Sequence, residues 1–339
     1  MAHDTRITGV PTGLAFAVLS ATSFALSGPL ARGLMDLGWT AGSATLARVA
    51  IAAVVLAIPG GMAMRGRWEV LRTAWLTILF YGLFAVAGTQ FFYFLAIGYL
   101  DVSIALLIEY TAPVFVVAWM WLRHGHRPGA LTYVGGAVAI VGLVFLLDVV
   151  GGGGGADPIG VMFALAATSG AVVYFILSGK LDTGLPAVSL ASGGLLVATA
   201  ILGLVLALGI IPSGFATGTV QLIPLAMPWW LAVLLLGLVA AALAYVTGIA
   251  AVRRLGARLA SFVALSEVVA AATFAWILLG QELGPVQLTG AALVLGGVVL
   301  VKLGEPRDEA AVDVEELLAA DDVPSDHQPS SLERPPLGP

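Results

Sequence analysis

Charged side chains are scarce in this sequence. Asp, Glu, Lys and Arg make up only 10% of its 339 residues, whereas 60% are hydrophobic and the mean hydropathy is +1.02. A soluble globular protein carries about a quarter of its residues as these four types. Because so few charges cannot cover a surface in contact with water, the sequence predicts an integral membrane protein embedded in a lipid bilayer.

Cysteine is absent, and none of the four histidines lies inside an apolar run. The lack of cysteine excludes disulfides, thiolate metal sites and cysteine nucleophiles. Haem ligation and histidine-based zinc sites within the membrane are not expected either. The chain also lacks the dense basic face that nucleic-acid binding requires. We therefore expect no metal, no cofactor and no nucleic-acid partner.

Ten apolar runs are long enough to be transmembrane helices, because a bilayer core of about 30 Å needs about 20 apolar residues in a helix. Turn formers such as Pro59-Gly60-Gly61 and Gly284-Pro285 separate them. The sequence thus predicts an all-α membrane protein with ten transmembrane helices. They are expected at residues 13–35, 41–58, 75–97, 102–122, 130–147, 159–180, 187–211, 229–252, 258–279 and 286–301.

Basic residues gather at alternate ends of these runs. If the N-terminus is inside, the outer loops hold Arg32 alone, and Arg48 lies within the second run. The positive-inside rule then places both termini in the cytoplasm, in a cell (inner) membrane. Residues 304–339 are acidic and Pro-rich and lack aromatics, so a disordered cytoplasmic tail is expected there.

The chain contains an internal repeat. Shifted by 155 residues, segment 105–144 falls on 260–299, and both copies share a Trp-x3-Gly-x3-Gly-x5-Gly pattern that begins at Trp121 and Trp276. A weaker match places Gly13 on Gly160. Each half then holds five spans, and because five is odd the halves enter the membrane in opposite orientations. The predicted domains are 13–147 and 159–303, joined by a Gly-rich outer linker at 148–158. Inverted repeats are typical of secondary transporters.

These motifs resemble a known family. The pattern from Trp121 to Gly135, its copy from Trp276 to Gly290, and Ala47-Arg48-Val49 are similar to paired EamA domains of the drug/metabolite transporter superfamily, over residues 13–303. The stretches 93–97 and 104–113 resemble its threonine/homoserine exporter branch. In the second half, Val268 follows Glu267 where the family usually has proline.

The resemblance implies a transporter with a central cavity. It would export a small metabolite, most simply an amino acid such as threonine or homoserine, by alternating access. The first, third, fourth, sixth, eighth and ninth spans would line the cavity.

Two acidic residues lie at membrane depth, where a charge costs about 2.5–3.5 kcal/mol on insertion scales. Glu109 is in the fourth span and Glu267 in the ninth. Pro113 has no N–H, so the Glu109 carbonyl also loses its helical donor and a carboxylate and a free acceptor are presented at one level. Both acids are candidates for substrate binding and proton coupling. Alternatively, each forms a buried structural hydrogen bond.

Other polar residues could bind a small zwitterion or could simply join helices. Ser27 precedes Gly28-Pro29, which predicts a kink in the first span, and Arg48 either binds a carboxylate or pairs with a helix end or a buried acid. The further candidates for substrate binding are Gln90, Tyr93, Tyr110, Thr111, Tyr174 and Tyr245.

Three other functions remain as alternatives. The protein could export drugs or other metabolites, or it could be a lipid-handling or structural membrane protein. An intramembrane enzyme is disfavoured because the spans hold no HExxH motif, histidine or cysteine. The sequence also has no GxxxxGK[ST] motif, which excludes ATP-driven pumping by this chain alone.

Overall fold

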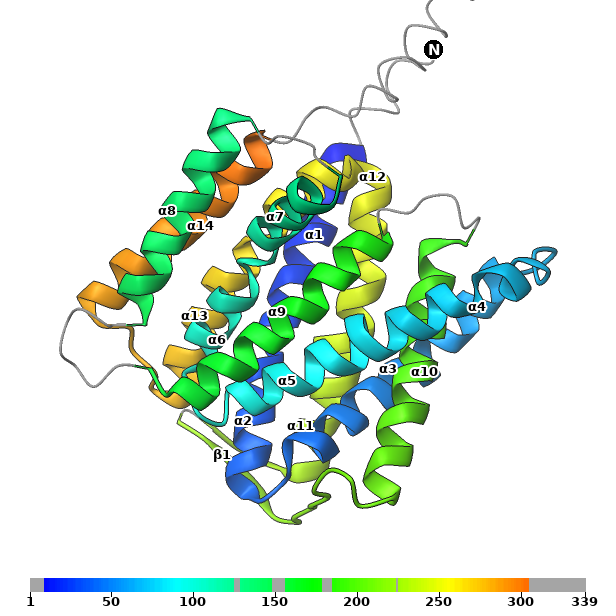
Figure 1. Cartoon of the computed structure of the whole chain (residues 1–339). Helices are drawn as coiled ribbons and strands as arrows, with labels where there is room; N and C mark the ends of the chain where they lie inside the picture. Colours follow the sequence, from blue (N-terminus) through cyan, green and yellow to red (C-terminus); the bar gives the residue numbers. More distant parts are fainter. Residues whose placement is uncertain (1–8, 125–128, 148–155, 179–184, 224, 305–339) are drawn as a thin grey trace, which may run out of the picture.

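The computed structural model describes residues 9–124, 129–147, 156–178, 185–223 and 225–304, and nearly all of them are helical (Figure 1). The predicted 148–158 linker lies mostly, and the 304–339 tail almost wholly, outside these ranges. The elements of the first half are α1 (Gly9–Ala25), α2 (Ser27–Leu37), α3 (Ala41–Ala63), α4 (Val70–Phe80), the π-helical segment η1 (Tyr81–Gly88), α5 (Thr89–Ala96), α6 (Val102–Glu109), α7 (Ala112–His124) and α8 (Ala130–Leu146).

The second half begins with α9. Its elements are α9 (Pro158–Ser178), α10 (Ala187–Ala207), β1 (Thr219–Leu222), β2 (Leu225–Pro228), α11 (Trp229–Leu234), the π-helical segment η3 (Leu235–Leu243), α12 (Ala244–Ala264), α13 (Ser266–Leu279) and α14 (Pro285–Gly304).

Seven helical segments of the described chain are long and apolar enough to cross a membrane. They coincide with the predicted first, second, third, fourth, seventh, eighth and tenth spans. The predicted fifth, sixth and ninth spans correspond to shorter apolar helices, at Ala130–Leu146, Pro158–Val173 and Ser266–Leu279. The protein is therefore a multi-pass membrane protein.

Two predicted loops are helical instead. Pro59-Gly60-Gly61 was expected to end the second span, but α3 continues to Ala63. The neighbouring α10 holds this last turn, because Ser189 donates its hydroxyl to the Gly60 carbonyl at 2.9 Å. Likewise, α12 continues through residues 253–257, which were predicted to form an inner loop.

A small β-hairpin is the one departure from an all-α fold within the described residues. Strands β1 and β2 pair antiparallel in the loop before the eighth span, with Val220 opposite Met227. The hairpin packs on α2 and α11. Its buried side chains join the large apolar core described below, so this loop forms a cap over one end of the bundle (Figure 1).

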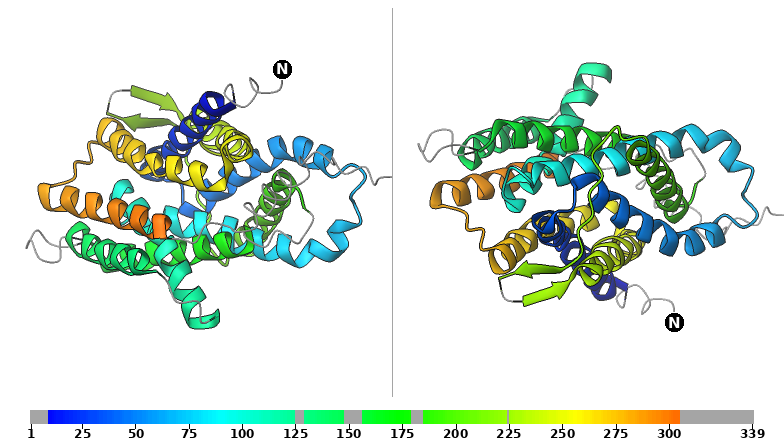
Figure 2. Two further views of the ribbon diagram at one scale, coloured as in Figure 1. Left: turned by 90° about the horizontal axis from the view of Figure 1, so that it is seen from above. Right: turned by 90° about the horizontal axis from the view of Figure 1, so that it is seen from below.

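Equivalent helices of the two halves pack against each other's half: a helix of the first half contacts elements of the second, and its equivalent in the second half contacts the corresponding elements of the first. Helix α1 packs on α12 and α13, while α9 packs on α5 and α6. Similarly, α3 packs on η3, whereas α10 packs on η1. The pairs α3–α10 and α8–α14 join equivalent elements and lie at opposite edges of the molecule (Figure 2). Equivalent elements of the two halves therefore have corresponding neighbours in the opposite half.

Glycines at equivalent positions follow the same relation. A Cβ on Gly13 would lie 2.7 Å from Leu255, and a Cβ on Gly160 would lie 2.6 Å from Leu100. The two glycines are 147 residues apart (160 − 13) and the two leucines 155 (255 − 100). The weaker Gly13/Gly160 match in the sequence thus corresponds to equivalent contacts in space.

The two π-helical segments also occupy equivalent positions. Tyr81–Gly88 shifted by 155 residues covers 236–243, and η3 spans Leu235–Leu243. Gly82 and Gly237 are equivalent, and a Cβ on either would meet a β-branched side chain of the neighbouring helix at 2.6 or 2.5 Å. Close packing therefore accompanies the locally widened helix in both halves.

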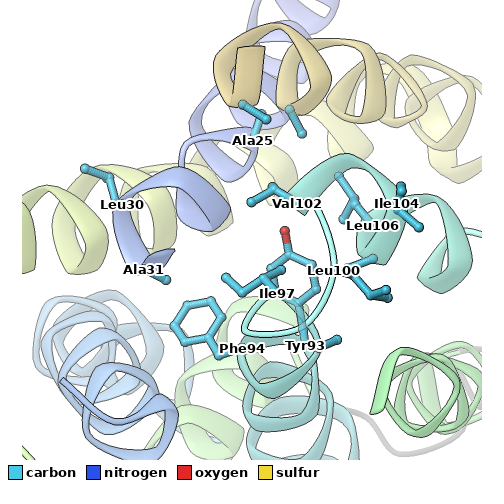
Figure 3. Packing of buried hydrophobic residues seen from close by; sticks show 14 of the residues in the cluster. Ala25, Leu30, Ala31, Tyr93, Phe94, Ile97, Leu100, Val102, Ile104 and Leu106 are labelled. Atoms are coloured by element: carbon cyan, nitrogen blue, oxygen red, sulfur yellow. The ribbon is translucent and has the colours of Figure 1, made fainter. Parts of the chain in front are cut away.

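A large apolar core fills the end of the bundle that carries the hairpin. It includes Leu34, Trp39, Ile97 and Leu236 together with residues of β1 and β2. Figure 3 shows part of it, where side chains of α2 face those of α5 and α6. A hydrogen bond joins the two halves at this end, because Gln281 Oε1 accepts from the Val102 N–H at 3.0 Å. This end of the bundle is closed.

Candidate functional site

Three predicted spans are interrupted near their middles. The first breaks between α1 and α2 at Leu26, the fourth between α6 and α7 at Tyr110-Thr111, and the ninth between α12 and α13 at Leu265. Interrupted helices leave backbone groups that lipid cannot satisfy, so such segments are tolerated only where protein or a water-filled cavity surrounds them. In transporters such breaks mark the substrate site.

The break in the first span is the predicted kink. Pro29 has no N–H, which frees the Ala25 carbonyl. Ser27 is only 5% exposed, and its hydroxyl makes no hydrogen bond with the described residues.

The break in the fourth span lies at Glu109, as Pro113 predicts. The Ile108 carbonyl accepts two hydroxyl hydrogen bonds, from Thr111 at 2.6 Å and from Thr168 of α9 at 3.2 Å. By contrast, no described residue donates to the Glu109 carbonyl. One carbonyl of this break is therefore satisfied and the next is open.

The ninth span has an equivalent break without a proline. Ser266, which lies 155 residues after Thr111, donates its hydroxyl to the Val263 carbonyl at 2.6 Å. Val268 stands where the family usually has proline, but the helix is still broken here. The Ser266 hydroxyl donates to the Val263 carbonyl in place of a backbone N–H.

The two breaks differ in how they are closed. The Tyr110 hydroxyl of the first half lies 3.1 Å from the Ala264 carbonyl oxygen, and Ala264 is the repeat equivalent of Glu109. The same hydroxyl lies 2.9 Å from Glu267 Oε2. The equivalent of Tyr110 in the second half is Leu265, which cannot donate in return. The second break is thus sealed by the first half, and the break at Glu109 is open.

Glu109 itself is a partly buried carboxyl group. Within the described residues it forms neither a hydrogen bond nor an ion pair. It lies within electrostatic range of Arg48, Glu267 and Tyr93. A carboxylate in such surroundings needs a donor, and an ammonium group of a substrate is one that would fit.

Arg48 supplies the fixed positive charge of this cluster. It is 3% exposed, and its guanidinium donates to Gln90 Oε1 and, at 2.9 Å, to the Ala240 carbonyl of η3. The guanidinium carbon lies 6.0 Å from the ring centroid of Phe24 and 5.7 Å from that of Phe94. Arg48 thus pairs with a backbone carbonyl inside the eighth span, which is neither the helix end nor the buried acid expected as its structural partner. Three of its five N–H groups have no hydrogen-bond partner among the described residues.

Gln90 and Tyr93 lie on the same side of the third span. The Gln90 oxygen accepts from Arg48, while its amide N–H groups donate to no described residue. Tyr93 is 5% exposed, and a Cβ on Gly28 would lie 2.7 Å from its hydroxyl oxygen. Figure 3 shows this hydroxyl directed toward Val102. Tyr93 is thus a buried donor beside the break in the first span, and neither its hydroxyl nor the partly buried Gln90 amide has a partner in the described structure.

Three further predicted residues are Tyr245, Thr111 and Tyr174. Tyr245 lies within electrostatic range of Arg48 and stacks edge-on against Phe24, with ring centroids 5.1 Å apart. The hydroxyl of Thr111 is engaged in closing the helix break. Tyr174 belongs to α9, but its side chain lies outside the described part of the structure. The structure therefore brings together Arg48, Gln90, Tyr93, Glu109, Tyr110, Tyr245 and Glu267.

Three residues at this site were not singled out in the sequence. Phe24 and Phe94 flank the Arg48 guanidinium, and Thr168 completes the break in the fourth span. Aromatic and hydroxyl side chains are common in transmembrane helices, and their spacing carries no signal for these roles. Only the isolated charge of Arg48 within an apolar run could have directed attention to its neighbours.

Comparison with known proteins decides the family. The EamA-like transporter family matches residues 11–148 and 158–303, which is two copies of its domain. The chain belongs to the EamA-like transporter family. This confirms the resemblance to the drug/metabolite transporter superfamily seen in the sequence. As an EamA-like protein it is a transporter of small molecules and not an enzyme.

Individual relatives are more distant. The threonine/homoserine exporter RhtA of Escherichia coli (strain K12) is 27% identical over 229 residues, which are 68% of this chain and 70% of that protein. RhtA of Salmonella typhimurium (strain SL1344) is 26% identical over the same lengths. A protein of known crystal structure aligns with a TM-score of 0.57 and 23% identity, over 87% of this chain and 96% of the other. That likeness supports the fold alone.

Proposed function

We propose that this EamA-like protein exports small zwitterionic metabolites, most simply amino acids such as threonine or homoserine, by alternating access. The observation that carries the proposal is the open break at Glu109. A carboxylate and a backbone carbonyl lie at one level there, and both lack a partner among the described residues. A substrate ammonium group could satisfy both acceptors.

Two donors for a substrate carboxylate, Arg48 and Tyr93, lie within electrostatic range of Glu109. Tyr93, Gln90 and Ser27 each carry an unpartnered O–H or N–H, and Arg48 carries further N–H groups. A zwitterion would therefore find acceptors on the fourth span and donors on the first, second and third. The name of the RhtA relatives points to the same substrate class.

We further propose ten transmembrane helices in two inverted repeats, over 13–147 and 159–303, with both termini in the cytoplasm of an inner-membrane protein. The exchange of packing partners between the halves supports the inverted arrangement. Since the chain has no cysteine, single cysteines can report the sidedness of each loop. A Ser213→Cys protein should react with a membrane-impermeant maleimide from outside, and Arg67→Cys only from inside. The opposite pattern would invert the topology.

Counterflow in proteoliposomes tests the function. Labelled threonine, homoserine and other amino acids would be offered to protein loaded with an unlabelled counterpart, with and without a pH gradient. We expect saturable exchange in the wild type, at least a tenfold loss with Glu109→Gln, and no loss with the exposed-loop control Glu69→Gln. Full activity of Glu109→Gln would contradict the role of Glu109. No exchange of any amino acid by folded protein would favour another metabolite, a drug or a lipid.

A further inference from the structure

The Tyr110 hydroxyl lies between two acceptors of the ninth span. Its oxygen is 2.9 Å from Glu267 Oε2 and 3.1 Å from the Ala264 carbonyl oxygen. The Ala264 carbonyl has no backbone donor at the break, because the Val268 N–H bonds to Leu265 instead at 3.2 Å. Among the described residues, Tyr110 is the donor available to it.

Proton counting shows that these three groups are not fully satisfied by Tyr110 alone. A phenol has one proton, an ionised carboxylate is an acceptor only, and so is a carbonyl. If Glu267 is ionised, one proton must serve two partly buried acceptors, and one of them is left without a donor among the described residues. If Glu267 is protonated, it donates to Tyr110, and Tyr110 donates to Ala264, so that every group is paired.

The charged residues on the described helices that pack against α13 do not supply a second donor to Glu267. Helix α13 packs against α1, α2, α6 and α12. On α2, Arg32 and Asp36 pair with each other at 3.1 Å. On α12, Arg253 and Arg254 are exposed, and Arg254 lies over the Phe16 ring of α1. The groups in electrostatic range of Glu267 are Arg48, Tyr93, Glu109 and Tyr110.

We propose that Glu267, Tyr110 and the Ala264 carbonyl form a proton-binding site, and that Glu267 holds the proton in this conformation. This inference rests on the proposed transport function for its role in coupling, but the site itself is testable without a substrate. Loss of the proton to water converts the carboxyl to a carboxylate and leaves Tyr110 with two competing acceptors. The contact between the breaks of the fourth and ninth spans is then weakened.

The repeat gives the two acids different tasks. Because Leu265 stands where Tyr110 stands in the first half, Glu109 has no phenol partner among the described residues, and its carbonyl stays open to a substrate. Glu267 has a phenol partner and an adjacent carbonyl that depends on the same phenol. Glu109 would thus bind the substrate and Glu267 the proton, and Tyr110 is a positioning residue that links the proton to the helix break.

Infrared spectroscopy of the full-length protein in liposomes tests the proton site directly. The wild type should show the C=O stretching band of a protonated carboxylic acid. The component of this band that is due to Glu267 should vanish in Glu267→Gln. In Tyr110→Phe the component should remain but move to higher wavenumber, because the acid has lost its hydrogen-bond partner. In Glu109→Gln it should be unchanged. The folded state of each variant is checked by gel filtration.

Two results would overturn the inference. One is a spectrum in which Glu267→Gln removes no carboxylic acid component, which would mean that Glu267 is ionised. The other is an unchanged component in Tyr110→Phe, which decides the question even where Glu267→Gln fails to fold. If these bands behave as expected but counterflow finds no amino-acid substrate, the proton site stands and the proposed function fails. If both stand, Glu267→Gln should retain exchange and lose its response to a pH gradient.

Discussion

A single arginine fixes the charge of the site. Arg48 is buried, always protonated, and has no carboxylate in ion-pair contact within the described residues. The free-energy cost of burying its charge is offset by hydrogen bonds to Gln90 and Ala240 and by cation–π contacts with two phenylalanine rings. Since Ala240 belongs to the eighth span, this side chain also joins the second, third and eighth spans.

Replacement of Arg48 should therefore destabilise the fold as well as the site. Arg48→Gln removes a charged donor from a buried backbone carbonyl, and a hydrogen bond to a charged group contributes about 1.5–3 kcal/mol. We expect a loss of roughly 2–4 kcal/mol in the free energy of unfolding. Thermal unfolding in detergent, with the exposed-loop variant Arg67→Gln as control, measures it. Equal melting temperatures for the two variants would show that Arg48 does not hold these spans together.

Asp101 lies at the closed end of the bundle, in the short connection between α5 and α6. Burial raises the pKa of its carboxyl group, and the nearby Arg32 charge partly opposes this. A raised pKa in the folded state means that stability is lost as the pH rises through that pKa. Asp101→Asn avoids this loss, so it should be at least as stable as wild type at neutral pH and no more stable below about pH 4. An Asn variant that melts lower at neutral pH would contradict this sign.

Helix α14 shows how element packing depends on glycine. A Cβ on Gly297 would lie 2.5 Å from the Ala139 backbone nitrogen of α8, whereas a Cβ on Gly296 would meet nothing within 4 Å. Gly135, Gly142 and Gly290 make equally close backbone approaches in the same α8–α14 interface. Small residues allow such approaches between membrane helices.

Neighbouring glycines of α14 therefore provide a matched pair of variants. Gly297→Ala must push α8 and α14 apart and should cost about 1–3 kcal/mol. Gly296→Ala should be neutral or should stabilise by about 0.5–1 kcal/mol, because alanine loses less backbone entropy in a helix. Melting temperatures of the two variants in detergent provide the comparison. Similar effects at both positions would mean that the helices are not in close contact at Gly297.

Sequence reasoning located the elements well and their interruptions in part. The breaks at Pro29 and Pro113 were predicted because proline removes a backbone donor. The break before Ser266 depends on a hydroxyl hydrogen bond, and the continuation of α3 past Pro59 depends on Ser189 of another helix. Neither could be predicted, because both are decided by packing between segments far apart in the chain. The same holds for the π-helical segments and for the hairpin.

The candidate site was predicted as a set of residue types rather than as an arrangement. The isolated acids Glu109 and Glu267 were found because charges are rare at membrane depth. That Tyr110 bonds to Glu267, while Glu109 is left without a partner in the described residues, follows from where the fourth and ninth spans cross. A periodic apolar sequence does not encode that crossing.

At the scale of the whole molecule, one end of the bundle is closed. The apolar core, the hairpin and the Gln281–Val102 hydrogen bond all lie there. In the proposed topology this is the outer end, so the structure represents a state closed to the outside. Transport then requires these contacts to open.

The reaction rate of a single introduced cysteine measures how far this end of the bundle opens. Ser103 is 1% exposed beside the Gln281–Val102 hydrogen bond. Ser103→Cys should react slowly with an impermeant maleimide from outside, and adding Gln281→Ala should accelerate the reaction several-fold. The exposed Ser213→Cys should react quickly in both backgrounds. Equal rates for Ser103→Cys and Ser213→Cys would show that this end is open.

The unequal closure of the two helix breaks also bears on how such a protein can arise. Two identical five-helix chains related by a two-fold axis would place the same residue opposite each break, so both breaks would be sealed or both would be open. Here Tyr110 seals Ala264 while Leu265 leaves Glu109 open. That difference is available only to two halves that are free to mutate separately. Under the proposed assignment one half binds the cargo at Glu109 and the other binds the driving ion at Glu267, a division that two identical halves could not make.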